Sequence, residues 1–214
     1  MGVRMSPSET GRKTLFRTLQ PLVLASSSPR RREMLTTMGL SFEVVPSDID
    51  ETGGEGEAPR SLVEGWAKEK AQVVSRQFPD CWVLAADTIV VLGGTIFGKP
   101  QNVDDAAGML RQLSGRSHEV ISGVCLKHGL RHFVHVRSVR TLVHFKPLDA
   151  AEIDAYVATG EPMDKAGAYG IQGMGAFLVR SIEGSYTNVV GLPLCETLED
   201  LMANGVIALA ASAT

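Results

Sequence analysis

The sequence predicts an α/β protein built on a mixed β-sheet rather than a doubly wound parallel sheet. Apolar runs typical of strands and segments with helical spacing both recur along the chain, but without a strict strand–helix–strand rhythm. In addition, two long strand-like segments at residues 118–129 and 131–145 follow each other directly, joined at Gly129 as in a hairpin. Together these patterns favour a sheet that contains both parallel and antiparallel neighbours.

In the first half of the chain, apolar runs alternate with segments of helical spacing. The runs predict strands at Leu22–Ala25, Ser41–Ser47 and Cys81–Asp87. The helical spacing predicts helices at Pro29–Met38 and Ser61–Gln77. Gly39 is expected to end the first helix, and Gly93-Gly94 to form the turn of a hairpin between Thr88 and Pro100.

The second half shows clearer helix boundaries. Helices are expected at Val103–Leu113, Asp149–Thr159 and Leu194–Met202. Asn102 is the expected N-cap of the first of them, and Gly160 follows the end of the second. Residues 161–191 are expected to form loop and strand.

Chain length and composition suit one globular unit or two closely joined lobes, since the 214 residues are 44% hydrophobic and 21% charged. Residues 1–20 are polar and lack the apolar segment of a secretory signal, so we expect a disordered extension there. Residues 206–214 are expected to be a fraying tail. This leaves residues 21–205 as a single folded domain.

Charge and cysteine content narrow the class of function. The net charge of −3 gives no general attraction to nucleic acid or to an anionic membrane, so we expect neither as a partner. No segment approaches the roughly 20 apolar residues of a membrane helix. Cys81, Cys125 and Cys195 form no C-x-x-C pair, which is typical of reduced, mostly buried thiols in a cytoplasmic protein.

The stretch "SSSPRRREML" places cations where a helix start normally carries acids. Pro29 suits the first helical position, so Arg30, Arg31 and Arg32 fall in the first turn, which the unsatisfied N–H groups already make positive. An anion bound by backbone N–H groups, serine hydroxyls and guanidinium groups would make this arrangement favourable. An isolated Ser/Pro/Arg run is more often a surface patch, but the preceding strand and following helix favour a phosphate site here.

Asp87 follows the most hydrophobic run and is expected at the carboxyl end of a strand, where open α/β sheets bind ligands. Hydrolysis of a phosphoanhydride needs a divalent metal, and aspartate oxygens suit Mg²⁺. Lys70 and Lys99 could complete a polyphosphate site. A segment such as the one around Lys70 is more often a solvated helix face with charge pairs, whereas Lys99 lies between Gly98 and Pro100, a constrained place for a surface lysine. For the acidic cluster Asp48, Asp50 and Glu51, a metal site and a solvated loop remain equally open.

The histidines do not form a metal site by this reasoning. His128, His132, His135 and His144 fall within the presumed hairpin. On a strand, His132 and His135 point to opposite faces, so we reject a zinc site.

Seven sequence blocks resemble, in order, the Maf-like nucleotide pyrophosphatases. The blocks are "LASSSPRRREML", "EKA", "AADTIV", "GKP", "LSGRSHEVISGV", "EPMDKAGAYGIQGMG" and "GSYTNVVGLP", and they span roughly Leu22 to Leu201. The resemblance implies an elongated mixed sheet flanked by helices, with two lobes around a deep cleft, as in inosine-triphosphate pyrophosphatases, commonly in a homodimer. It also implies Mg²⁺-dependent cleavage of a nucleoside triphosphate to monophosphate and pyrophosphate by residues 21–205.

The same resemblance assigns roles to single residues. It implies that Asp87 is the proton acceptor, and that Arg30, Thr88 and Gln172 select the substrate. Phosphate contacts would come from Ser26, Arg31, Lys70 and Lys99, and metal contacts from Asp87 and Glu33. The block "DKAGAYGIQG" is similar to the branch that acts on dTTP and UTP rather than on 7-methyl-GTP. Gly98 departs from the family, in which many members carry Glu before Lys-Pro.

Three functions are weighed against one another. The first is an enzyme that hydrolyses dTTP, UTP and related pyrimidine triphosphates, since a Gln side chain can match the imide edge of uracil or thymine. The second is a non-catalytic, nucleotide-binding regulator of cell division, which would not need Asp87. The third is a nucleic-acid-binding module that uses "PRRR", which the acidic net charge does not support.

Overall fold

The computed structural model describes residues 3–5, 14–47, 49 and 57–210. An eight-stranded mixed sheet runs through it in the order β1-β4-β3-β5-β7-β8-β9, with β6 paired to β5. Its strands are β1 (Val3–Met5), β3 (Leu22–Leu24), β4 (Phe42–Val44), β5 (Trp82–Leu92), β6 (Thr95–Phe97), β7 (Ser117–His128), β8 (Phe133–Phe145) and β9 (Val179–Glu183). Strand β3 pairs in parallel with β4 and β5, whereas β5, β7, β8 and β9 pair antiparallel, so the predicted mixed sheet is confirmed.

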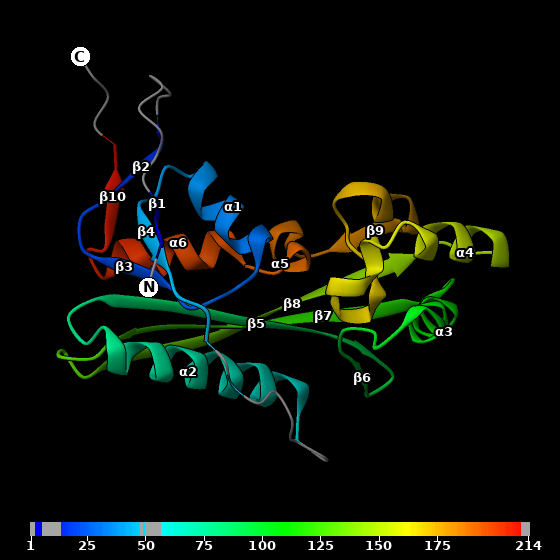
Figure 1. Ribbon diagram of the computed structural model, residues 1–214, viewed down its shortest axis with the longest axis horizontal. Coiled ribbons are helices and arrows are strands. Elements are labelled where there is room, and N and C mark those ends of the chain that lie inside the picture. The colour runs from blue at the N-terminus through cyan, green and yellow to red at the C-terminus, as the bar shows by residue number, and fades with distance from the viewer. Residues whose placement is uncertain (1–2, 6–13, 48, 50–56, 211–214) are drawn as a thin grey trace.

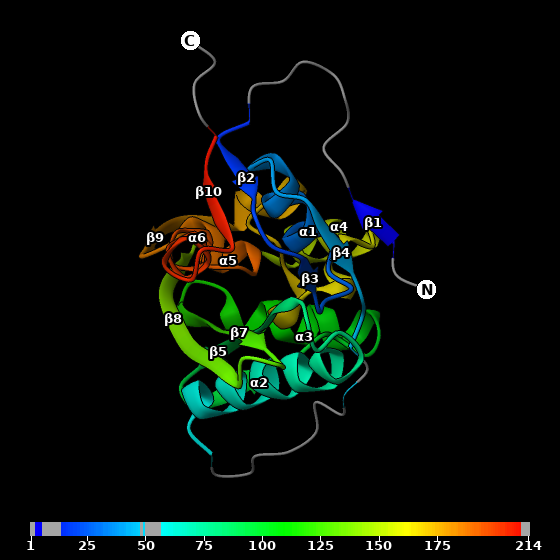
Figure 2. The ribbon, with the colours of Figure 1, turned by 90° about the vertical axis from the view of Figure 1, so that its left-hand side faces the viewer.

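Helices cover both faces of this sheet (Figures 1 and 2). The α-helices are α1 (Pro29–Thr37), α2 (Pro59–Gln77), α3 (Val103–Leu113), α4 (Ala150–Ala158), α5 (Tyr186–Val190) and α6 (Leu194–Ala203). Near one end of the sheet, α2 packs on one face, and α1 and α6 lie on the other. Within the described residues, no helix is both long and apolar enough to cross a membrane.

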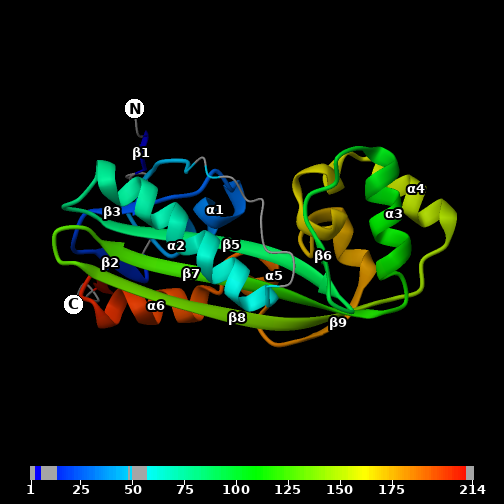
Figure 3. The ribbon, with the colours of Figure 1, turned by 90° about the horizontal axis from the view of Figure 1, so that it is seen from below.

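The molecule has two lobes along the long strands β5, β7 and β8 (Figure 3). One core packs Trp82, Leu24 and Leu126 with residues of α1 and α6. A second core packs α3 and α4 against Phe145 and Tyr169 at the other end of the sheet. The expected elongated, two-lobed architecture is therefore confirmed, and each lobe buries its own set of apolar side chains.

Most of the predicted elements form close to their expected bounds. Gly39 ends α1 with a φ of +86°, and Asn102 caps α3 by accepting a hydrogen bond from the Asp105 backbone N–H at 2.9 Å. The Gly93-Gly94 turn joins β5 to β6, where Leu92 pairs with Thr95. These positions depend on local backbone chemistry, which is why the sequence predicts them well.

The segment between α4 and α6 differs from the prediction of loop and strand. It contains helix α5 and three short 3₁₀ helices, η1 (Glu161–Asp164), η2 (Ala166–Ala168) and η3 (Gly173–Leu178). Helical turns this short leave no periodic apolar pattern, so the sequence does not reveal them. Strand β9 is the one strand of this segment.

The folded part of the chain extends beyond the expected bounds of residues 21–205 at both ends. Strand β2 (Phe16–Thr18), in the predicted extension, pairs antiparallel with β10 (Ile207–Leu209), in the predicted tail. Phe16 and Ile207 are buried in the first core, which explains why these short strands fold onto the domain. The rest of the extension, apart from the strand β1 and residues 14–20, lies outside the described residues.

The thiols are free, as expected, but they are not mostly buried. Cys125 is buried, Cys81 is half-buried and Cys195 is exposed on α6. Burial raises the pKa of the Cys125 thiol to about 12, so this side chain behaves as a small apolar group.

Candidate active site

A cavity of about 590 Å³ brings together residues of both lobes. Its walls come from the β3–α1 turn, α2, β5, the segment after β6, the 3₁₀ region and the end of α5. Eight of the predicted site residues line it: Ser26, Arg30, Arg31, Lys70, Asp87, Thr88, Lys99 and Gln172. The ninth, Glu33, is exposed on α1 and is not among the lining residues. The sequence blocks thus meet at one cavity.

A buried ion pair lies in this cavity. The Lys70 Nζ donates to Asp87 Oδ1 at 3.1 Å, and each residue is only 7% exposed. Lys70 comes from α2 and Asp87 from β5. Contrary to the prediction, Asp87 lies in the middle of β5 rather than at its end, because the strand continues through the apolar residues after Thr88 to the Gly93-Gly94 turn.

Arg31 turns from the first turn of α1 into the protein rather than toward solvent. Its Nε donates to the Gly191 carbonyl at 2.7 Å and its Nη1 to the Ala86 carbonyl at 2.8 Å. Nη1 also contacts Ser26 Oγ, and Nη2 contacts Thr88 Oγ1, both at 3.1 Å. The guanidinium group thereby joins α1, β5 and the segment after α5 into one wall of the cavity.

Thr88, next to Asp87 on β5, is held by a chain of hydroxyl and carbonyl contacts. Its Oγ1 lies 2.8 Å from Ser122 Oγ on β7 and donates to the Gly191 carbonyl at 3.3 Å. Ser122 Oγ in turn lies 3.4 Å from the carbonyl oxygen of the fully buried Asn188, whose amide donates to the Val120 carbonyl and to Thr141 Oγ1, each at 3.0 Å. This network fixes the direction of the Thr88 side chain.

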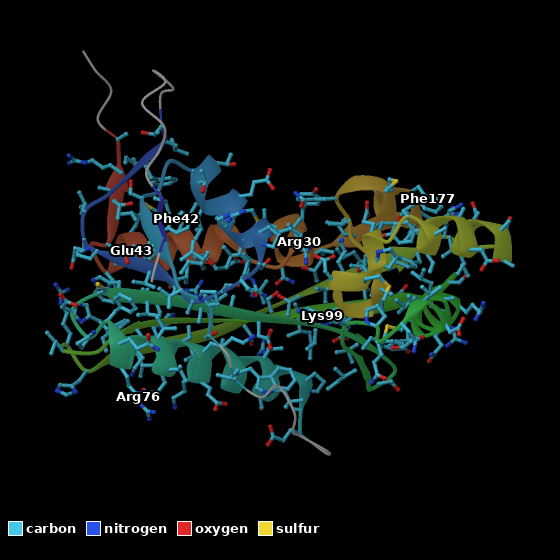
Figure 4. All side chains as sticks on the ribbon, in the orientation of Figure 1. Arg30, Phe42, Glu43, Arg76, Lys99 and Phe177 are labelled. Carbon is cyan, nitrogen blue, oxygen red and sulfur yellow. The ribbon has the colours of Figure 1, made fainter. Side chains whose placement is uncertain are left out.

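Arg30, the neighbour of Arg31, lies between the two lobes (Figure 4). Its Nη1 donates to Asp164 Oδ2 at 2.9 Å, and Asp164 belongs to η1 in the second lobe. Arg32 is exposed. The three cations of the helix start therefore have three different environments, and the Ser28 side chain makes no capping hydrogen bond to them or to the helix.

Lys99 and Gln172 are exposed side chains on the cavity wall. Figure 4 shows Lys99 near the middle of the molecule, beside the long strands. Within the described part of the chain, neither side chain makes a hydrogen bond or ion pair, so both remain available to a ligand.

Glu161 stabilises the segment that carries Gln172. Its carboxylate accepts hydrogen bonds from the backbone N–H groups of Met174 and Gly175, at 3.0 and 2.9 Å, and from the Tyr156 hydroxyl at 2.9 Å. Burial alone would raise the pKa of Glu161, but these hydrogen bonds outweigh it and hold the pKa below its usual value. The anionic carboxylate thus orders the turn that follows Gln172.

Sequence reasoning missed several residues that line the cavity. Asp164 and Lys165 are polar, whereas Trp66 and Tyr169 provide apolar surface. The adjacent charges of "DKAG" within a matched block were the available signal for the first two. Nothing in the sequence indicated that Arg30, 134 residues away, is the partner of Asp164.

The donor set is compatible with one hard divalent cation. Asp87 and Asp164 are the carboxylates among the described residues that line the cavity, and these residues contain no cluster of three or more potential metal-binding side chains. A hard divalent cation can be held by one or two carboxylates together with substrate phosphates and water, and Asp87 offers one such carboxylate. Asp48, Asp50 and Glu51 lie outside the described residues.

The chain is similar over most of its length to curated proteins that share one name. A curated protein of Geobacter sulfurreducens named dTTP/UTP pyrophosphatase is 52% identical over 186 residues, covering 87% of this chain and 97% of that protein. One from Desulfotalea psychrophila with the same name is 48% identical over 195 residues, covering 91% of this chain and all of that protein. Among solved structures, the Ham1 protein of Staphylococcus aureus has a TM-score of 0.42 at 12% identity, over 59% of this chain and 72% of that one.

The family model of Maf-like proteins matches residues 21–204, which include every residue that lines the cavity. This match and the two relatives cover both lobes and the site between them. The chain therefore belongs to the Maf-like protein family.

Proposed function

We propose that this protein is a nucleoside triphosphate pyrophosphatase that hydrolyses dTTP and UTP to monophosphate and pyrophosphate. The observation that carries the proposal is the buried Lys70–Asp87 pair in a cavity that Gln172 also lines. The relatives named dTTP/UTP pyrophosphatase support the same reaction and do not favour a non-catalytic regulator.

In the proposed reaction, a water molecule attacks a phosphorus atom of the triphosphate and pyrophosphate leaves. Asp87 would orient this water and accept its proton, as a positioned carboxylate does in general base catalysis. Lys70 and Lys99 would offset the charge that develops on the phosphate oxygens, with Ser26 as a further donor. Arg31 belongs to the same phosphate site, and its hydrogen bonds to Ala86 and Gly191 hold the wall in place.

Selection of the base would take place on the 3₁₀ side of the cavity. The amide of Gln172 offers a donor and an acceptor, which match the imide N–H and carbonyl groups of uracil and thymine. A base that cannot complete both hydrogen bonds leaves polar groups unpaired, which lowers its rate of reaction. Arg30 and Thr88 would contribute to this choice through the walls that they hold.

We further propose Mg²⁺ as the divalent metal, held on the protein by Asp87. Bound there, it would neutralise phosphate charge and lower the pKa of a water molecule. The predicted contact to Glu33 finds no support in the placement of that side chain, which is exposed on α1 and is not among the cavity-lining residues.

The proposal also covers the setting of the enzyme. We place it in the cytoplasm, where nucleoside triphosphates are abundant and where free thiols like the three of this chain stay reduced. We expect a homodimer, as the family resemblance implies, and neither nucleic acid nor membrane as a partner of a chain with a net charge of −3.

A substrate panel tests the function. Each nucleoside triphosphate, including 7-methyl-GTP, is incubated with the purified protein and Mg²⁺, and the released pyrophosphate is measured. We expect turnover of dTTP and UTP but not of 7-methyl-GTP, and loss of turnover when a chelator removes the metal. Turnover of 7-methyl-GTP, or no pyrophosphate from any triphosphate, would contradict the proposal.

A further inference from the structure

The two walls of the cavity are joined by an ion pair between Arg30 and Asp164, and the proposed chemistry gives Asp164 no role. Arg30, in the first turn of α1, donates from Nη1 to Asp164 Oδ2 at 2.9 Å. Its Nη2 lies 3.5 Å from the Asp164 backbone carbonyl. Both residues line the cavity, one from each lobe, so this ion pair links the phosphate side of the cavity to the side that carries Gln172.

Asp164 is itself held firmly on the second lobe. The Lys165 Nζ donates to Asp164 Oδ1 at 2.7 Å and to the Glu161 carbonyl at 2.5 Å. Burial alone would raise the pKa of Asp164, but the hydrogen bonds from Lys165 and Arg30 outweigh it and keep the pKa below its usual value. The carboxylate is therefore charged at neutral pH.

The segment behind Asp164 is the same one that orders Gln172. Lys165 binds the backbone of Glu161, and the Glu161 carboxylate binds the backbone N–H groups of Met174 and Gly175, just after Gln172. A displacement of Asp164 relative to Arg30 would therefore also displace Gln172 relative to the phosphate side. The spacing between the phosphate side and Gln172 would change with it.

We propose that Asp164 is a specificity-determining positioning residue, which acts by holding Arg30 and thereby fixes the spacing between the base-binding and phosphate-binding sides of the cavity. This inference rests on the proposed function. The role proposed for Asp164 is not one of global stability, since the ion pair is partly exposed, with side-chain exposures of 25% for Arg30 and 58% for Asp164. Such exposed pairs contribute little to global stability, so the main effect of their loss should be on substrate choice.

The test is a double-mutant cycle on Arg30 and Asp164, with pyrophosphate release measured for UTP, dTTP, CTP and ATP. Asp164→Ala should raise the KM for UTP by roughly tenfold with kcat within about twofold, and should lower the preference for UTP over ATP. Asp164→Glu, which keeps the carboxylate, should recover most of that preference. In the Arg30→Ala background, Asp164→Ala should add little, because the two residues act as one unit.

Asp154→Asn is the matched control. Asp154 is exposed on α4 in the same lobe, outside the cavity, and makes no ion pair with any described residue. The Asp154→Asn substitution removes one negative charge from this lobe without changing the cavity, so wild-type kinetics are expected. Thermal unfolding of each variant checks that a kinetic change does not come from a misfolded lobe. Asp164→Asn, which removes the charge but keeps the size of the side chain, is measured beside Asp164→Ala for the same reason.

Three results would overturn the inference. The first is unchanged nucleotide preference in Asp164→Ala. The second is a lower KM for UTP, which indicates that Asp164 only withholds Arg30 from the nucleotide. The third is full additivity of the two substitutions. If the wild-type protein releases pyrophosphate from other triphosphates only, the proposed function fails, but the same cycle on those substrates still tests the ion pair.

Discussion

At the level of single residues, the contacts of Arg31 explain how a positive charge is tolerated in the first turn of helix α1. The residue is 9% exposed, and its guanidinium group donates to the Gly191 and Ala86 carbonyls and to the hydroxyls of Ser26 and Thr88. The cation is therefore stabilised by carbonyl and hydroxyl oxygens of the cavity wall as well as by any phosphate that binds beside it. A lysine has one charged nitrogen and cannot reproduce this planar set of contacts.

Arg31→Lys tests this reading. We expect the variant to lose about 2–4 kcal/mol of unfolding free energy, since at least two hydrogen bonds to a charged group disappear, and to release pyrophosphate more slowly. Urea denaturation and the pyrophosphate assay measure the two effects. Arg32→Lys, at the exposed next position of α1, should stay within about 0.5 kcal/mol of wild type. Equal stability of the Arg31 and Arg32 variants would contradict the role given to Arg31.

At the level of elements, the contact of helix α2 with the sheet positions Lys70 next to Asp87. Gly123 of β7 lies opposite Asp87 in the register of β5 and β7. A Cβ atom at this glycine would lie 2.2 Å from the Val63 carbonyl oxygen of α2. The close approach of α2 to the sheet therefore depends on the absence of a side chain at this position.

Gly123→Ala should push α2 away from β7. We expect a loss of about 1–3 kcal/mol of unfolding free energy, and a fall in turnover because Lys70 moves with the helix. Gly65→Ala on the same helix is the control, since its Cβ would meet open space, and it should gain about 0.5–1 kcal/mol. An alanine at Gly123 with wild-type stability and turnover would show that the helix contact does not position the site.

The sequence predicts those features that depend on local backbone chemistry. It does not predict those that depend on contacts between residues far apart in the chain. The Gly93-Gly94 turn, the Asn102 cap and the Gly39 helix end are local features, and all three form as expected. The prediction that Asp87 ends a strand is wrong: the apolar run stops at this residue, but ten consecutive pairs with β7, from Trp82 to Val91, continue the strand. The site residues were predicted from sequence blocks, whereas the Arg30–Asp164 contact required the three-dimensional structure.

For the whole molecule, a buried histidine couples stability to pH. His118 is 1% exposed in the core of the second lobe, where its Nε2 lies 2.8 Å from the Tyr169 hydroxyl. Burial, with a smaller contribution from His144, lowers the pKa of His118 to about 4. In the unfolded chain the pKa of histidine is about 6.5, so the unfolded state binds more protons between these two values. The contribution of neutral His118 to the unfolding free energy is therefore fully present above pH 6.5 and is lost as the pH drops toward 4.

His118→Gln removes this titration while its amide can still bind Tyr169. Between pH 7 and pH 4.5, the wild-type protein should lose about 2–3 kcal/mol more unfolding free energy than the variant. Urea denaturation at the two pH values measures the difference. Leu130→Gln, in the exposed turn between β7 and β8, changes no titratable group and should keep the wild-type pH dependence. A His118 variant that loses as much stability as the wild type would show that this residue is not responsible.

The central claim is that Asp87, paired with Lys70 in the cavity, carries out the hydrolysis. The most direct measurement compares pyrophosphate release from UTP by wild type and by Asp87→Asn, with UTP binding measured on both. The amide oxygen can still accept the Lys70 hydrogen bond, so the variant should fold and should bind UTP in the absence of metal within a few-fold of wild type. Its kcat should fall by about 10²–10⁴. Turnover close to wild type in a folded Asp87→Asn variant would contradict the account.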